Sequence, residues 1–308
     1  MSGSLRSGRA FGTDASRQAA VGQVLLEIDR ESGRAEIVLN RPEKHNALSV
    51  PMRYRLAELI ADCENDDDVR VVVLRGNGPS FCSGNEINED WGQRTPDKRR
   101  FALTDATRYG TDMTYGRAAF TQAIHKCAKP TILQMHGYCA AAAYFMIATR
   151  CDLVIASEDA RIGALEGRFL GPAGAVSHLH LNRILGTKAA RRLGYTAEPI
   201  SGAEAQALGL AHRAVPPAML RETVLSVASD IAARDSASNQ HLKARIRAAE
   251  AYLGASGSAM TGLLLSHFLR AESDELDFWK EVRAGNVKKA LDADKARASQ
   301  ATAKGGSL

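Results

Sequence analysis

Residues 129–152 read KPTILQMHGYCAAAAYFMIATRCD, and we interpret the rest of the chain around this stretch. The apolar and β-branched residues 131–135, interrupted only by Gln134, predict a short buried strand. A turn at residues 136–138 and four alanines at 140–143 then lead into an apolar run, which predicts a buried helix beginning where the turn ends. A strand that enters a helix through small residues leaves backbone N–H groups open to an anion or a developing oxyanion.

Sequence patterns on both sides of this stretch predict a mixed α/β domain. Residues 23–29 and 34–39 alternate around a Glu-Ser-Gly turn, which is typical of a β-hairpin. Ser49 is placed to cap a helix over residues 51–63, and the valine run at 70–75 predicts a strand buried on both faces. Further strands are predicted at 153–157 and 160–163, and helices at 104–126, 173–185, 188–193, 219–234, 237–253, 258–271 and 275–283. Ser201 and Glu204 have the spacing of a capping box.

Composition narrows the class of protein. The 308 residues include 45% hydrophobic and 24% charged side chains, as in an ordinary globular enzyme. No apolar run approaches the ~20 residues that cross a bilayer, so we expect a soluble protein. The net charge of +5 is modest and basic residues are interspersed with acidic ones, which suits a small anionic ligand and argues against nucleic acid.

Cysteine usage and the N-terminus indicate a reducing compartment. The five cysteines form no C-x-x-C pair and are odd in number, so neither a zinc site nor a disulfide framework is predicted. The first 20 residues are rich in Ser, Gly and Arg without an apolar segment, which indicates a disordered extension, with a mitochondrial transit peptide as the alternative. We expect a cytoplasmic protein, or a mitochondrial matrix protein in a eukaryote.

A glycine-rich loop after the valine strand is the second candidate for open backbone donors. Residues 76–87 read GNGPSFCSGNEI, and their small side chains let the backbone turn sharply beside a ligand.

Several of these segments resemble, in the same order, those of the crotonase superfamily, the enoyl-CoA hydratases and isomerases. Residues 40–48, NRPEKHNAL, are similar to its NRPxxxNAL loop, and residues 81–87, FCSGNEI, to its FxAGxD[IL] loop. Residues 129–152 resemble its KPxIAAVNGxxxGGGxxLxxxCD stretch. The loop that follows and the helix start GTKAARRL also fit, so the resemblance covers residues 22–284.

The resemblance implies a fold, a ligand class and an assembly. It implies an α/β, crotonase-like (ClpP/crotonase) spiral of repeated ββα units, acyl-CoA substrates with no further cofactor and no metal, and homotrimers or homohexamers. We therefore divide the chain into an extension (1–20), a ββα core (21–215), a C-terminal helical trimerisation region (216–286) and a charged tail (287–308).

The resemblance also implies a shared step, in which the thioester carbonyl becomes an enolate held by two backbone N–H groups. By motif position these donors are Ser83 and Ala142. One such donor contributes about 3–4 kcal/mol of transition-state stabilisation. Lys44 would meet a CoA phosphate unless it is simply a solvated lysine. The full predicted substrate site is Lys44, Asn46, Ala47, Leu48, Ser83, Gly84, Asn85, Glu86, Ile87, Ala142 and Phe145.

The carboxylates depart from the family pattern. Family hydratases hold a water molecule between two glutamates, and the first of these positions is Phe145 here, whereas the second maps to Glu166. Because one general acid or base is typically worth ~100- to 10,000-fold in rate, a single glutamate favours moving a proton between carbons. The alternative for Glu166 is an exposed carboxylate or an ion pair with Arg161 or Arg168.

We therefore predict an acyl-CoA enzyme that uses Ser83 and Ala142 as oxyanion donors and Glu166 as general acid and base. Isomerase-like proton transfer or atypical hydration is the leading reaction. A carbon–carbon bond hydrolase acting on a cyclic β-diketone or its CoA ester is the next alternative. From another class, the chain would be a non-catalytic protein of the same fold that binds RNA or CoA.

Overall fold

The computed structural model describes residues 18, 20–87, 119–165, 175–252, 284, 288–289 and 292. Its strands are β1 (Val24–Asp29), β2 (Arg34–Leu39), β3 (Val71–Gly76), β4 (Thr131–Met135), β5 (Tyr138–Ala140), β6 (Leu153–Ser157), β7 (Arg161–Gly163) and β8 (Arg213–Val215). Its helices are η1 (Pro42–Lys44), α2 (Val50–Asn65), α4 (Ala119–Lys126), η2 (Ala143–Ala148), α5 (Ala175–Thr196), α6 (Gly202–Ala207), η4 (Pro217–Met219), α7 (Leu220–Ala232) and α8 (Ser236–Tyr252).

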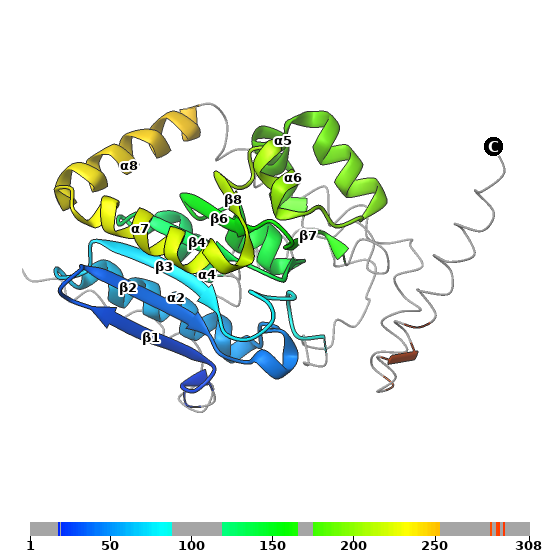
Figure 1. Cartoon of the computed structure of the whole chain (residues 1–308), viewed down its shortest axis with the longest axis horizontal. Helices are drawn as coiled ribbons and strands as arrows, with labels where there is room; N and C mark the ends of the chain where they lie inside the picture. Colours follow the sequence, from blue (N-terminus) through cyan, green and yellow to red (C-terminus); the bar gives the residue numbers. More distant parts are fainter. Residues whose placement is uncertain are drawn as a thin grey trace, which may run out of the picture.

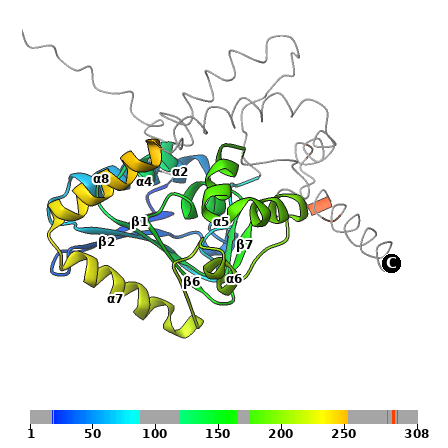
Figure 2. The same cartoon turned by 90° about the horizontal axis from the view of Figure 1, so that it is seen from above.

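A six-stranded sheet in the order β1-β2-β3-β4-β6-β8 forms the centre (Figure 1). Strand β5 pairs with β7 in a second, two-stranded sheet. The central sheet is parallel except for the β1–β2 hairpin. Figure 2 shows α7 on one side of this sheet and α2 and α4 on the other. Val72 and Leu74 of β3 join the core with α2 and α4, whereas Val71 and Val73 face α7. The predicted burial of this strand on both faces is confirmed.

Local capping signals act as the sequence predicts. The Ser49 hydroxyl accepts a hydrogen bond from the Met52 N–H (3.3 Å) at the start of α2. Ser201 and Glu204 form a reciprocal capping box on α6. Gly186 adopts φ 74° and breaks α5 into the two helical segments that were predicted.

The stretch between β4 and η2 differs from its prediction, which was a turn leading directly into a helix. A strand, β5, intervenes, and its Tyr138 pairs with Arg161 of β7. Ala141 then turns the chain with a left-handed φ of 52° before η2, which is a π-helix. A strand of three residues is too short to show alternation, and its hydrogen bonds come from residues far away in sequence.

Several predictions fall on residues that the structure does not describe. They are most of the extension at 1–20 and of the tail at 287–308, the larger part of the helix predicted at 104–126, and the helices predicted at 258–271 and 275–283. None of the helices in the described ranges is long and apolar enough to span a membrane.

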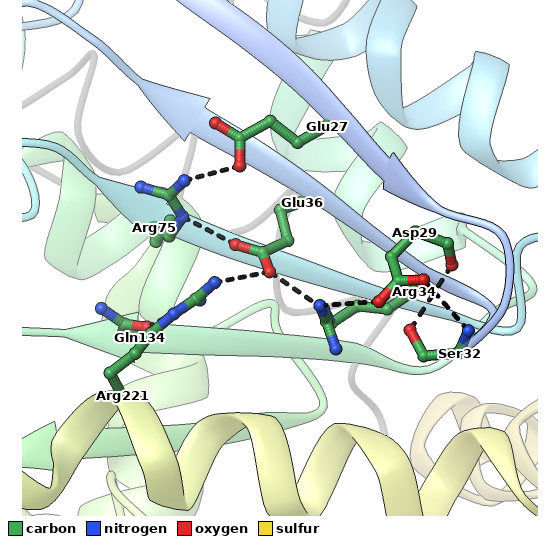
Figure 3. Close-up of polar contacts among 8 residues, drawn as sticks. All are labelled: Glu27, Asp29, Ser32, Arg34, Glu36, Arg75, Gln134 and Arg221. Carbon is green, nitrogen blue, oxygen red and sulfur yellow. Dashed lines mark hydrogen bonds and ion pairs between the residues drawn. The ribbon is translucent and has the colours of Figure 1, made fainter.

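A buried carboxylate links α7 to the sheet on the face that α7 covers. Glu36 of β2 accepts from Arg34 Nε (2.9 Å) and Arg75 Nε (2.7 Å) within the sheet. Arg221, in the first turn of α7, donates to the same carboxylate (2.7 Å) and to the Gln134 side chain (3.3 Å) (Figure 3). These side chains share one face because alternate strand residues point the same way.

Helix α8 is attached to the core by cationic side chains. Lys243 Nζ donates to the carbonyl oxygen of Lys129 (2.8 Å) and pairs with the Asp152 carboxylate. Arg247 donates to the carbonyl oxygens of Lys126 (2.9 Å) and Cys127 at the end of α4. These contacts satisfy carbonyl groups that α4 leaves open at its C-terminus.

Burial and nearby cations make the stability of the fold depend on pH through His125. Burial, together with Arg150 and Arg247, lowers the pKa of His125 from 6.5 to about 4. The lowered pKa means that the folded state binds the proton less readily than the unfolded state, so stability present above pH 6.5 is lost as the pH falls toward 4. Between pH 7 and pH 5 we expect the wild type to lose about 1–2 kcal/mol more unfolding free energy in urea than His125→Asn does. Equal losses would contradict this role for His125.

Candidate functional site

The glycine-rich loop and the alanine stretch meet at Gly84. The Cys82 N–H donates to the Tyr138 carbonyl oxygen (2.9 Å), and the Ala140 N–H donates back to Cys82 (3.1 Å). Gly84 has φ 111°, and a Cβ added to it would lie 2.6 Å from the Ala141 Cβ and 3.5 Å from the Ala142 nitrogen. Only glycine fits this crossing, because a methyl group would collide with Ala141.

Ala142 presents an open backbone donor at this crossing. Its φ and ψ of −56° and −35° are helical, and it directly precedes η2. As the first helical residue it has no partner one turn earlier, and its N–H has no acceptor among the described residues. The backbone donor that the alanine run predicts is therefore open in the structure.

The N–H of Ser83 is not open, contrary to the prediction. It donates to the carbonyl oxygen of His45 (2.9 Å), and the Ser83 hydroxyl donates to the carbonyl oxygen of Lys44 (3.4 Å). Both groups therefore tie the glycine-rich loop to the loop around η1. If either group turned toward a ligand, its existing hydrogen bond would be broken.

In the same loop, the backbone N–H of Asn85 points away from Leu48 and the loop around η1. Asn85 and Leu48 form a parallel β-bridge, whose bonds run from the Leu48 N–H to the Gly84 oxygen (2.7 Å) and from the Glu86 N–H to the Leu48 oxygen (3.0 Å). In such a bridge the central residue's own N–H points away from its partner. The Asn85 N–H thus points away from Leu48, and no acceptor for it lies within the described ranges. The motif positions predicted Asn85 as a substrate contact but assigned the backbone donor to Ser83.

Two of the residues predicted to line the substrate site have side chains with structural contacts. The Asn46 side chain is fully buried: its oxygen accepts from the Arg41 N–H (2.7 Å), and its nitrogen donates to the carbonyl oxygens of Asn77 (2.9 Å) and Ser80 (2.8 Å). Leu48 is buried as well, and its backbone forms the bridge to the glycine-rich loop. The polar atoms of Asn46 already have protein partners, and the Leu48 side chain packs in the hydrophobic core.

The remaining predicted contacts line the same loops. Glu86 is buried and pairs with the Arg41 guanidinium (2.9 Å), which also donates to the Ala47 carbonyl oxygen (3.2 Å). Lys44 is exposed on η1, and Ile87 is half-buried where the described part of the loop ends. Glu86 therefore braces the loop, whereas the Lys44 amine is accessible to an anion.

Aromatic and basic side chains that sequence reasoning did not connect lie beside this loop. The His45 and Tyr138 rings meet edge to face at 5.7 Å, and the Arg161 guanidinium lies 5.7 Å from the Tyr138 ring centre. These residues come from three separate segments, so no local pattern indicated their proximity.

Phe145 contributes no acid or base. It is 2% exposed, and its ring centre lies 5.0 Å from that of Tyr144 within the hydrophobic core. Glu166, the predicted general acid and base, lies outside the described residues, which end at Leu165 before this gap. Among the residues that are described, no three His, Cys, Asp or Glu side chains are placed to hold a metal ion.

Known proteins share both the sequence pattern and the fold. A family model described as enoyl-CoA hydratase/isomerase matches residues 29–284. A putative enoyl-CoA hydratase of Thermus thermophilus is 32% identical over 207 residues, which cover 66% of this chain and 76% of that protein. The (7aS)-7a-methyl-1,5-dioxo-2,3,5,6,7,7a-hexahydro-1H-indene-carboxyl-CoA hydrolase of Mycobacterium tuberculosis is 33% identical, over 67% of this chain and 77% of that protein.

A solved structure extends the likeness to nearly the whole fold. The enoyl-CoA hydratase of Mycobacterium smegmatis superposes with a TM-score of 0.77 at 28% identity. The match covers 90% of this chain and 94% of that chain.

Proposed function

Because the chain belongs to the enoyl-CoA hydratase/isomerase family, we propose that it activates acyl-CoA thioesters by holding an enolate oxygen between the N–H groups of Ala142 and Asn85. The α/β crotonase-like fold predicted from the sequence is confirmed by this membership and by the superposed structure. Membership of this family makes the chain an acyl-CoA enzyme, and its own residues favour one reaction over the others.

The observation that carries the proposal is the crossing at Gly84, where two backbone donors are open. The Ala142 N–H lies at the start of a helix, and the Asn85 N–H points away from its β-bridge with Leu48. Gly84, which precedes Asn85, packs against Ala141, which precedes Ala142. Fixed donors stabilise a charge that develops on the thioester oxygen, because no reorganisation is needed when the charge appears. Each donor of this kind supplies about 3–4 kcal/mol.

The acid–base chemistry favours proton transfer between carbons. With Glu166 as the base, the C2 proton of a 3-enoyl-CoA moves to its carboxylate, and the electrons pass to the thioester oxygen as a dienolate. The protonated Glu166 then returns the proton to C4, which yields the 2-enoyl-CoA. Phe145 leaves no carboxylate on η2 to hold a water molecule, so hydration is expected to be slower.

A ring-opening hydrolase is the second candidate function, because one relative at 33% identity is a hydrolase of a bicyclic CoA ester. The same two N–H groups would hold the enolate that leaves when the carbon–carbon bond breaks. For the assembly, we infer a homotrimer or homohexamer. The exposed side chains of Leu242, Ile246 and Tyr252 on α8 support an interface there.

Substrate comparison tests the reaction. We expect 3-hexenoyl-CoA to be isomerised at least ~10-fold faster than crotonyl-CoA is hydrated, and Glu166→Gln to lower isomerisation ~100-fold while CoA affinity is unchanged. Both rates are followed by absorbance of the enoyl thioester.

Four outcomes would change the proposal. Faster hydration would favour an atypical hydratase, and turnover confined to a cyclic β-diketone CoA ester would favour the hydrolase. Equal rates for wild type and Glu166→Gln would exclude Glu166 as the acid and base. A protein that binds no CoA thioester would be assigned to the non-catalytic class, and RNA binding would then be tested.

A further inference from the structure

The side-chain oxygen of Asn85 is a buried acceptor without a donor. Its Oδ1 atom is inaccessible to solvent, and no hydrogen-bond donor among the described residues reaches it. Leaving such a group unpaired destabilises a protein by about 1–3 kcal/mol, so an orphaned acceptor in a native fold calls for an explanation.

Asn46 shows what a structural asparagine looks like in the same region. All three of its side-chain hydrogen bonds are made within the protein. Two join the loop around η1 to the Asn77 and Ser80 carbonyl oxygens, and the third is accepted from the Arg41 N–H of the same loop. Asn85 lies on the adjoining strand segment but makes no such bonds through Oδ1. Its Oδ1 atom therefore makes no bond that holds the described loops together.

The location of Asn85 ties this acceptor to the candidate site. Its backbone N–H is one of the two proposed oxyanion donors, and its neighbour Gly84 contacts Ala141 beside the other donor. The acceptor and the donor belong to one residue, so a ligand oxygen held by the N–H would lie within about one residue's length of Oδ1. Asn85 thus offers a donor and an acceptor to one ligand.

We propose that Asn85 Oδ1 accepts a hydrogen bond from an N–H or O–H group that the bound acyl-CoA carries near its thioester carbonyl. Asn85 is then a substrate-positioning residue, and this inference rests on the proposed function. Two parts of the substrate have the required chemistry: the amide N–H groups of the pantetheine arm, which every CoA thioester has, and a hydroxyl on the acyl group.

Asn85→Leu tests the proposal, because leucine has nearly the shape of asparagine, lacks the acceptor and retains the backbone N–H. Losing one hydrogen bond is expected to weaken binding ~10-fold, measured as the Kd by calorimetry. KM should rise more than kcat falls, since the oxyanion donor is untouched. The melting temperature of the free protein should stay the same or rise, because a buried unpaired acceptor has been removed.

Matched variants separate this role from a structural one. Asn85→Gln retains a neutral amide acceptor and should weaken binding less than Asn85→Leu does. Asn46→Leu loses three internal hydrogen bonds and should melt several degrees lower. A lower melting temperature for Asn85→Leu with an unchanged Kd would overturn the proposal and make Asn85 structural.

Two ligands identify the group that Asn85 binds. If the pantetheine arm supplies the donor, Asn85→Leu weakens butyryl-CoA and 3-hydroxybutyryl-CoA equally; if the acyl hydroxyl does, only the second is weakened. Unchanged affinity for both, with wild type binding normally, overturns this inference alone. A wild type that binds neither thioester overturns the proposed function and this inference together.

Discussion

Replacing Ala142 with proline is expected to lower kcat by about 100- to 1000-fold, because it deletes one backbone donor from the proposed oxyanion site. The backbone already has φ −56°, which is within the range that proline fixes, and proline is well suited to the first position of a helix. The N–H that is lost has no acceptor within the described part of the chain, so no internal hydrogen bond breaks.

Ala142→Gly is the matched control, since it changes the side chain and retains the N–H. We expect its kcat to stay within about tenfold of wild type. Initial rates on 3-hexenoyl-CoA and thermal melting of all three proteins make the comparison. A proline variant that folds and turns over like the glycine variant would exclude Ala142 as a donor.

Replacing Glu36 with alanine is expected to lower the free energy of unfolding by about 3 kcal/mol, the lower end of the range for breaking a buried ion pair. Three arginines contact this carboxylate, whose side chain is only 4% exposed, whereas Arg221 is 43% exposed and retains water contacts. The loss removes the buried carboxylate that the three guanidinium groups share between the sheet and the first turn of α7 (Figure 3).

Glu27→Ala is the control on the same sheet face. Glu27 contacts Arg75 alone among these arginines (2.8 Å) and is 52% exposed, so its loss should change stability by less than about 1 kcal/mol. Urea unfolding at pH 7 measures both variants. Equal destabilisation by the two substitutions would show that burial of Glu36 contributes nothing beyond a surface ion pair.

The Glu36 effect should also depend on pH. Burial alone would raise the pKa of Glu36, but the hydrogen bonds and charges of Arg221 and Arg75 outweigh it and hold the pKa below its ordinary value of 4.5. The stabilisation is therefore present above pH 4.5 and is lost as the pH falls through the lowered pKa. The difference between wild type and Glu36→Ala should shrink in acid.

Local patterns were sufficient for most of the regular elements. The valine run of β3, the Ser49 cap of α2, the capping box of α6 and the break at Gly186 each depend on residues within one or two turns of the chain. The strand β5 was missed because its pairing with β7 is set by residues more than 20 positions away.

In the candidate site, too, local motifs predicted the segments, and long-range packing decided the roles of single atoms. Sequence motifs identified the two loops, the open helix start at Ala142 and the absence of a carboxylate at Phe145. They assigned the loop donor to Ser83, and they placed Asn46 and Asn85 together as substrate contacts. In the structure, the Ser83 N–H and the Asn46 side-chain oxygen have protein partners, whereas Asn85 Oδ1 has none among the described residues.

The sequence by itself therefore determined the family, the strand and helix pattern, and the two stretches that form the site, because periodicity and motif spacing are properties of neighbouring residues. Only the tertiary structure decided which backbone N–H groups are open. A donor is open or used according to the acceptor that packing brings to it, and the His45 carbonyl that takes the Ser83 N–H comes from a loop 38 positions earlier in the chain.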